Sequence, residues 1–153
     1  MHSRVVFAAL GKRGLPYIDD KIVPVTAEDM GRMISAGRGA AELPAFLAAG
    51  GDVDAIEPRS GMPLLHLACE HQNLETIRAL VAAGADLNGR DLAGQTPLHI
   101  AVDIDVDSVL QGEGQELQFD TTQLLLSLGA DGGIRDDSNR TPRDFAAGYG
   151  RRA

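Results

Sequence analysis

The chain repeats itself with a fixed period, and this periodicity limits what it can fold into. The segment GMPLLHLA begins at Gly61 and returns as GQTPLHIA from Gly94, 33 residues later. Between the two copies the sequence carries two helical apolar stripes and a turn. A fixed period of this length indicates stacked supersecondary units, because one unit alone cannot bury its apolar face. We therefore expect an all-α solenoid of helix-turn-helix units.

The repeat divides residues 26–153 into units of about 26–57, 58–90, 91–135 and 136–153. Gly84 and Gly129 end the second helices of units two and three and lie 45 residues apart, 12 more than the period of 33. The extra residues are expected between the two helices of unit three, over about residues 103–117. The fourth unit stops before a second helix, so we expect a partial cap with a water-facing side.

Residues 1–25 do not follow the repeat. They carry apolar clusters at residues 5–10 and 17–25, and Pro16 and Pro24 disfavour a continuous helix. We expect this segment to pack across the open end of the first unit. A partly disordered arm is the alternative, although a polar tail would not carry so many β-branched residues.

The composition argues against several classes of function. A net charge of −8 disfavours a nucleic-acid or anionic-membrane interface, since both require a basic surface. Cys69 is the single cysteine, so no internal disulfide can form, which fits a reducing compartment. No apolar run reaches the roughly 18 residues that span a bilayer. We expect a monomeric cytoplasmic protein, and its acidity is compatible with a basic partner protein.

The segment GQTPLHIA, read together with GADLN from Gly84, resembles the ankyrin repeat. The resemblance covers about residues 26–150. It implies an ankyrin-repeat solenoid, in which β-hairpin-like fingers project from a right-handed stack of helix pairs, and a non-catalytic role as a protein-protein interaction module. Unit two departs from the family, because Pro63-Leu64 replaces Thr-Pro and removes a capping hydroxyl. Unit one lacks the Thr-Pro-Leu-His signature.

The resemblance also implies where a partner would be contacted, because family members mostly bind other proteins through the finger tips and the exposed side of the first helices. The implied finger contacts are Arg59, Ser60, Met62, Arg90, Leu92, Gln95, Arg135, Asp137, Ser138 and Arg140. The implied contacts on the first helices are Glu70, His71, Asp103, Ile104 and Tyr149. Four of these, Met62, Leu92, Ile104 and Tyr149, are candidate apolar anchors in a mostly polar surface.

Catalytic and metal chemistry are poorly supported by the residue spacing. His66 and Cys69 lie three apart on one helix and could form a thiolate–imidazole pair. The structural interpretation is favoured, because His66 occupies the family's structural histidine position. A zinc site that adds His99 is disfavoured, since stacked helices lie about 8–10 Å apart whereas Zn–N bonds are about 2 Å. We expect no enzyme activity, no cofactor and no metal.

The insertion in unit three leaves three interpretations open. Asp103, Asp105 and Asp107 alternate and resemble the opening of a calcium loop, but Ser108 and Gly114 stand where that loop needs Gly and Glu. A solvated acidic inter-helix loop is favoured over calcium binding. The third interpretation is an acidic docking element for a basic partner. Its specific version is an immunity-type neutraliser of a basic toxin or nuclease, since some bacterial immunity proteins are ankyrin arrays.

Overall fold

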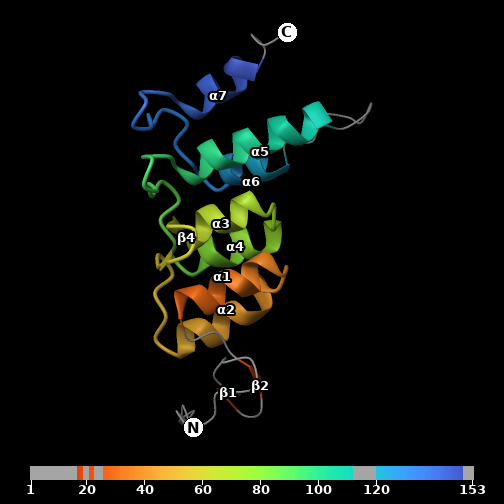
Figure 1. The fold of residues 1–153 in the computed structure, drawn as a ribbon, viewed down its shortest axis with the longest axis vertical. Coiled ribbons are helices and arrows are strands. Elements are labelled where there is room, and N and C mark those ends of the chain that lie inside the picture. The colour runs from red at the N-terminus through yellow and green to blue at the C-terminus, as the bar shows by residue number, and fades with distance from the viewer. Residues whose placement is uncertain (1–16, 19–20, 23–25, 112–119, 150–153) are drawn as a thin grey trace.

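The structure is a computed structural model that describes residues 17–18, 21–22, 26–111 and 120–149. In these residues the helices are α1 (Ala27–Ser35), α2 (Gly39–Ala48), α3 (Leu64–Glu70), α4 (Leu74–Ala82), α5 (Pro97–Gln111), α6 (Asp120–Ser127) and α7 (Pro142–Tyr149). The short strands are β1 (Tyr17–Ile18), β2 (Lys21–Ile22), β3 (Ile56–Glu57) and β4 (Met62–Pro63). Figure 1 shows the helix pairs stacked in chain order along the long axis, with α7 at the C-terminal end.

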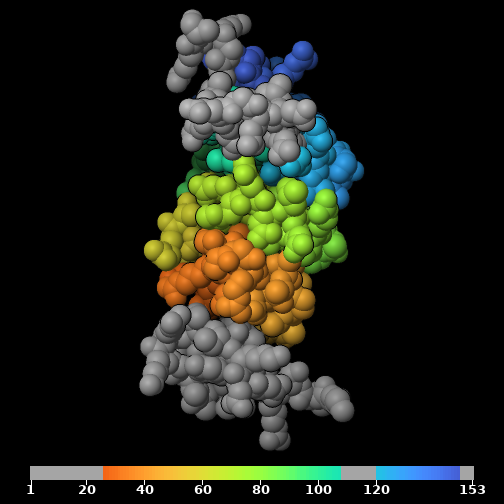
Figure 2. Space-filling view, turned by 90° about the vertical axis from the view of Figure 1, so that its right-hand side faces the viewer, coloured from red at the N-terminus to blue at the C-terminus, as the bar shows by residue number. Residues whose placement is uncertain are grey.

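The helices form two rows. Helices α1, α3, α5 and α7 contact one another in succession, and α2, α4 and α6 form the other row. Within each of the first three units the two helices also pack against each other. The fold is therefore the helical solenoid that the periodicity predicted. Figure 2 shows its layers following one another from orange through green to blue.

A continuous apolar core runs through the stack. Ile34 of α1, Leu64 of α3, Ile77 and Leu80 of α4 and Leu125 of α6 are fully buried. Helical spacing places such residues on one face, and each buried aliphatic side chain contributes about 1.5–3 kcal/mol to the free energy of unfolding. The core is built mainly from aliphatic side chains, as expected for a chain with 4% aromatic residues.

Local capping explains where several helices begin. Thr26 forms a reciprocal box with Asp29: the Asp29 amide donates to Thr26 Oγ1 and the Thr26 amide donates to Asp29 Oδ2, both at 3.1 Å. Asn73 Oδ1 accepts the Thr76 amide at 3.2 Å and caps α4. At α3 the N-cap is Pro63, whose side chain offers no oxygen. The predicted loss of this cap in unit two is confirmed.

The spacing had suggested that the insertion forms a loop from residue 103, but the structure has a helix there. Residues 103–111 continue α5 without interruption, so this helix has 15 residues against seven in α3. At about 1.5 Å per residue it is about 22 Å long, and Figure 1 shows it extending beyond the end of α3. The prediction of a solvated acidic inter-helix loop is therefore wrong for residues 103–111. The rest of it, at 112–117, lies outside the described residues.

Only four residues of the N-terminal segment are described. Strands β1 and β2 pair antiparallel, with Tyr17 opposite Ile22 and Ile18 opposite Lys21. The expectation that residues 1–25 pack on the first unit otherwise falls outside the described residues. Within the described part of the chain, none of the helices combines the length and apolar character needed to cross a membrane.

Candidate functional site

Three projecting fingers line one edge of the stack, and each is held by a carboxylate in the same place. These acids are Glu57, Asp91 and Asp136, and each accepts hydrogen bonds from two backbone amides of its own finger. Asp91 Oδ1 accepts the amides of Ala93 and Gln95, both at 2.9 Å. Glu57 accepts amides at 3.0 and 2.7 Å, and Asp136 accepts two at 2.9 Å. The three acids therefore shape the fingers from inside.

The pKa values of two of these acids are lowered. Burial opposes the charge of Asp136, but the amides of Arg140 and Ser138 and the Arg140 guanidinium outweigh it and lower its pKa. The same balance lowers the pKa of Glu57, where burial is outweighed by hydrogen bonds from Ser60 and from the Arg59 amide. Each carboxylate is held by donors of its own finger and is almost fully covered, with Glu57 and Asp136 only 5% and 6% exposed.

The fingers are numbered by the unit they lead into: finger two holds Glu57, finger three Asp91 and finger four Asp136. Finger two has one more residue than the other two. Its turn closes from Gly61 N–H to Glu57 C=O at 2.8 Å, four residues apart. The equivalent turn of finger three closes from Gly94 to Asp91 at 3.0 Å, three residues apart. The longer turn is matched by a longer acid, since Glu57 has one more methylene than Asp91. The internal hydrogen bonds differ accordingly: Asp91 and Asp136 accept the amides two and four residues on through Oδ1, whereas Glu57 accepts those two and three residues on through separate oxygens.

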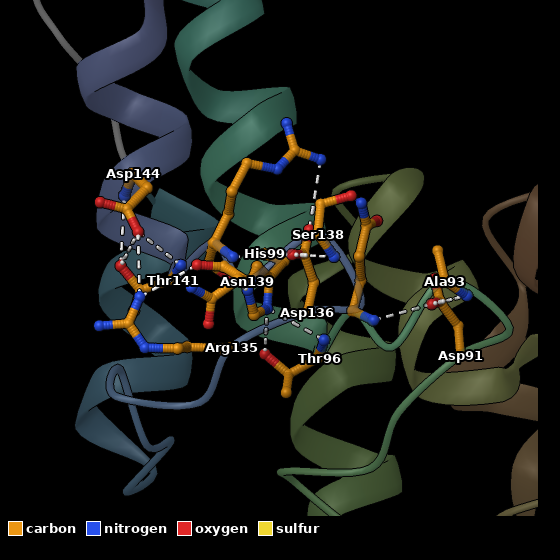
Figure 3. A network of polar contacts seen from close by, with 12 residues as sticks. Asp91, Ala93, Thr96, His99, Arg135, Asp136, Ser138, Asn139, Thr141 and Asp144 are labelled. Atoms are coloured by element: carbon orange, nitrogen blue, oxygen red, sulfur yellow. Dashed lines mark hydrogen bonds and ion pairs between the residues drawn. The ribbon is translucent and has the colours of Figure 1, made fainter.

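Neighbouring layers are joined by two equivalent histidines. His66 Nε2–H donates to the Gln95 carbonyl of the next finger at 2.7 Å, and His99 Nε2–H donates to the Arg140 carbonyl at 2.8 Å. On the other side of the ring, His99 Nδ1 accepts the Thr96 amide at 3.1 Å and contacts the Thr96 hydroxyl at 2.8 Å. Both imidazoles therefore act as structural links between layers, and Figure 3 shows the one around His99.

His66 lacks the second of these contacts. Pro63 stands at the position of Thr96 and has neither an N–H nor a hydroxyl, and among the described residues His66 Nδ1 has no hydrogen-bond partner. Burial lowers the pKa of His66, so the ring stays neutral. Burial also raises the pKa of the Cys69 thiol far above its usual range. A neutral imidazole and a protonated thiol, both fully buried, do not make a reactive pair.

The described acids of the insertion, Asp103, Asp105 and Asp107, lie on a helix and do not form the opening of a calcium loop. Side chains two apart on a helix point about 200° from each other, so Asp105 faces away from Asp103 and Asp107. Asp105 is 2% exposed and accepts the amide and the hydroxyl of Thr122 at 2.9 and 2.6 Å. It thereby anchors the start of α6. Among the described residues no cluster of three His, Cys, Asp or Glu side chains could hold a metal ion.

The predicted contact residues separate into two groups. Most finger residues are exposed, whereas Met62 and Gln95 are half-buried. Glu70 and His71 are exposed at the far end of α3, about 10 Å from its start. Asp103 and Ile104 are half-buried on α5, and the side chain of Tyr149 is outside the described set. The predicted finger residues therefore lie together on one edge of the stack, whereas Glu70 and His71 lie away from that edge.

Of the three predicted apolar anchors whose side chains the structure describes, Leu92 is the one that is strongly exposed. Its side chain is 83% exposed at the tip of finger three. Met62 and Ile104 are half-buried and pack against the core, which leaves less of them for a partner. Ile56 of β3 is 54% exposed and was not predicted. Ile56 occupies the position of Arg90 in the preceding finger, so comparing positions 34 residues apart would have identified Ile56 as a contact residue.

The fingers touch one another and form a ridge. A Cβ on Gly61 would lie 3.0 Å from Leu92 Cδ1, so Leu92 covers the turn of the preceding finger. In the same way Asp137 covers Gly94, and its amide donates to the Ala93 carbonyl at 3.1 Å. Both glycines also have positive φ angles, 69° and 73°, which other residues rarely adopt. Close approach and backbone conformation therefore both require glycine here.

The arginines of the ridge differ in how strongly they are held. Arg140 lies 4.4 Å over the Phe145 ring and pairs with Asp136 at 3.2 Å. Arg135 donates to the Asn139 carbonyl at 3.0 Å and lies 4.0 Å from Asp144 (Figure 3). The exposed side chains of Arg59 and Arg90 have no ion-pair partner among the described residues.

A separate open cleft of about 390 Å³ lies at the opposite end of the helices, between units one and two. His71 forms one wall and its Nε2 lies 3.1 Å from Ser35 Oγ. Its lining residues are Ile34, Ser35, Gly37, His71, Gln72, Asn73, Leu74 and Glu75. The cleft contains His71 of the predicted set but none of the finger residues.

Comparison with known proteins places these features in a family. A sequence model of three consecutive ankyrin repeats matches residues 33–111, and a single-repeat model matches residues 93–137. Protein phosphatase 1 regulatory subunit 27 of Mus musculus is 39% identical over 93 residues, which are 61% of this chain and 52% of that protein. Its Homo sapiens counterpart is 40% identical over 86 residues, covering 56% and 48%.

A more distant relative is the nuclear factor NF-kappa-B p105 subunit of Gallus gallus. It is 33% identical over 118 residues, which are 70% of this chain and 12% of the relative. The chain thus spans about half the length of the phosphatase regulatory subunits and a much smaller part of p105.

Proposed function

Because the chain belongs to the ankyrin repeat family, we propose that it binds a partner protein across its finger ridge and has no catalytic role of its own. The ridge consists of residues 56–62, 90–95 and 135–140. The relatives named as regulatory subunits support a role within a larger assembly, since a subunit acts through its contacts with other proteins. The buried histidines and Cys69 support the non-catalytic part of the proposal.

The observation that carries this proposal is the placement of Leu92. A large apolar side chain that is 83% exposed costs hydration free energy, yet Leu92 rests on the preceding finger with Gly61 beneath it. A partner that covered Leu92 would remove its apolar surface from water without having to order a flexible loop first. The fixed ridge therefore offers a preorganised anchor.

The proposal can be tested with peptides selected from a displayed random twelve-residue library on the immobilised full chain. Recovered peptides are then measured by fluorescence anisotropy against the wild type, Leu92→Asp and Leu126→Asp. Leu126 is the matched control, because it is also a leucine, 51% exposed, but lies on α6. We expect Leu92→Asp to weaken binding at least tenfold and Leu126→Asp to leave it unchanged.

Two outcomes would contradict binding at the ridge. In the first, the selection recovers no peptide. In the second, the recovered peptides bind Leu92→Asp as well as they bind the wild type. Circular dichroism of each variant verifies that the helices are intact, which is expected because both substitutions lie on exposed side chains.

A further inference from the structure

The outward positions of the three fingers form a row across the layers. Ile56, Arg90 and Arg135 each directly precede the inward-turned acid of their finger, so they occupy equivalent backbone positions. All three side chains are exposed. The row therefore presents one apolar side chain followed by two guanidinium groups.

The ridge is less acidic than the chain as a whole, because residues 56–62, 90–95 and 135–140 hold four arginines and four acids and so have a formal charge of zero. The chain carries a net charge of −8, but Glu57 and Asp136 are only 5% and 6% exposed and bind the amides of their own fingers. The four ridge arginines, in contrast, are exposed, as is one ridge acid, Asp137, while Asp91 is half-buried. At physiological ionic strength, charges on exposed groups are screened beyond about 8 Å, so a partner docked on the ridge senses mainly these nearby groups, among which exposed arginines outnumber exposed acids.

The two arginines of this row can pair with a partner's carboxylates without breaking a strong ion pair of the chain itself. Among the described residues Arg90 has no ion pair to break. The Arg135–Asp144 pair is 4.0 Å long, and its side chains are 57% and 51% exposed. Exposed pairs of this kind contribute less than about 1 kcal/mol, so a partner carboxylate can replace Asp144. Guanidinium groups match carboxylates by two parallel hydrogen bonds.

Resting on the proposed function, we infer that the ridge binds an acidic, extended segment of its partner protein. Stacked helices lie about 8–10 Å apart and an extended chain rises about 3.3 Å per residue, so neighbouring fingers meet residues about three apart. The segment carries one apolar residue, which contacts Ile56, and two acidic residues at successive intervals of about three, which pair with Arg90 and Arg135. Leu92 packs beside its middle.

The test reads the sequences of peptides recovered from the same twelve-residue library. We expect enrichment in Asp and Glu at intervals of about three and an affinity that falls as salt is raised from 50 to 300 mM. Arg90→Glu should weaken these peptides at least tenfold. The control Arg78→Glu should not, because Arg78 is equally an exposed arginine but lies on α4. A peptide with Lys in place of its Arg90-facing acid should regain affinity for Arg90→Glu.

Each outcome decides between the two proposals. The recovered peptides could depend on Leu92 and yet be neutral, or be basic, as the net charge of −8 would favour. Either result would overturn the inference that the bound segment is acidic, but not the proposal that a partner binds at the ridge. Acidic peptides that are indifferent to Arg90→Glu also overturn it. Peptides indifferent to Leu92→Asp, or no peptides at all, overturn both proposals.

Discussion

At the scale of single residues, two histidines in equivalent positions have different surroundings because of one upstream residue. His99 uses both ring nitrogens, the first on Thr96 and the second on the Arg140 carbonyl. His66 makes only the link to the next layer, because Pro63 cannot supply the other contact. A buried polar atom without a partner costs about 1–3 kcal/mol of stability.

Restoring the missing contact should stabilise the fold. Pro63 has φ −57° and ψ 151°, an extended conformation that threonine adopts readily. Pro63→Thr and Pro63→Val have side chains of similar shape and both provide an amide, so their difference isolates the hydroxyl. We expect the threonine variant to exceed the valine variant by about 1 kcal/mol in free energy of unfolding, measured by urea denaturation. Equal values would show that the hydroxyl adds nothing beyond the amide, which both variants supply to His66 Nδ1.

Two buried carboxyl groups should respond to pH in opposite senses. The pKa of Asp136 is lowered, so the unfolded chain takes up its proton first as the pH falls, and the wild type loses stability. Burial raises the pKa of Asp105, although bonds from Thr122 partly offset it, so there the folded chain takes up the proton first.

The measurement is the free energy of unfolding of the wild type, Asp136→Asn and Asp105→Asn between pH 7 and pH 3. As the pH falls, the wild type should lose stability relative to Asp136→Asn and gain stability relative to Asp105→Asn. Each variant serves as the control for the other. Difference curves that run in the same direction would contradict this assignment of the two shifts.

At the scale of elements, the repeat helices follow closely from the sequence, whereas the insertion does not. Helices α3 and α4 are the two helices expected from the apolar stripes between Gly61 and Gly94. The continuation of α5 through residues 103–111 was missed, because alternating Val102, Ile104 and Val106 lack a helical period. What holds this extension is a tertiary contact from Asp105 to Thr122, which local sequence does not reveal.

The finger site shows the same division. Position-by-position comparison of the repeats identified the finger residues, since each unit presents the same backbone positions. It could not show that Met62 packs against the core, that Arg140 is held over Phe145, or that Leu92 rests on Gly61. These facts depend on contacts between neighbouring layers.

Two glycines inside helices should respond to the same substitution with opposite signs. A Cβ on Gly39 of α2 would lie 2.6 Å from Thr76 Oγ1 of α4, whereas one on Gly148 of α7 would meet nothing within 4 Å. Gly39→Ala should therefore lower the free energy of unfolding by about 1–3 kcal/mol through overpacking. Gly148→Ala should raise it by up to about 1 kcal/mol through helix propensity. Thermal denaturation of both variants measures the difference; a stabilised Gly39→Ala would contradict the close packing of α2 on α4.

At the scale of the whole molecule, each layer is stabilised chiefly by its neighbours. Helix α7 contacts α5, and Phe145 lies edge-on to His99 with centroids 5.4 Å apart. In such an array, damage at one end should remain near that end, because distant layers share no contacts.

Phe145→Ala tests this locality. The side chain is half-buried, so its removal should cost about 2 kcal/mol, less than the 3–5 kcal/mol of a fully buried ring. Amide hydrogen exchange followed by mass spectrometry should show faster exchange in α7 and unchanged protection in α3. Phe145→Leu should give an intermediate effect. Faster exchange throughout the stack would instead indicate one cooperative body.

The length of the second finger constrains how this array can be altered by recombination. Its extra turn residue accompanies a different pattern of bonds, because the amides of Arg59 and Ser60 donate to separate oxygens of Glu57, whereas both amides bound by Asp91 donate to one oxygen. A cassette exchange that transferred the turn without Glu57, or Glu57 without the turn, would separate two matched changes. Insertions in these loops should therefore be inherited together with the carboxylate that binds them.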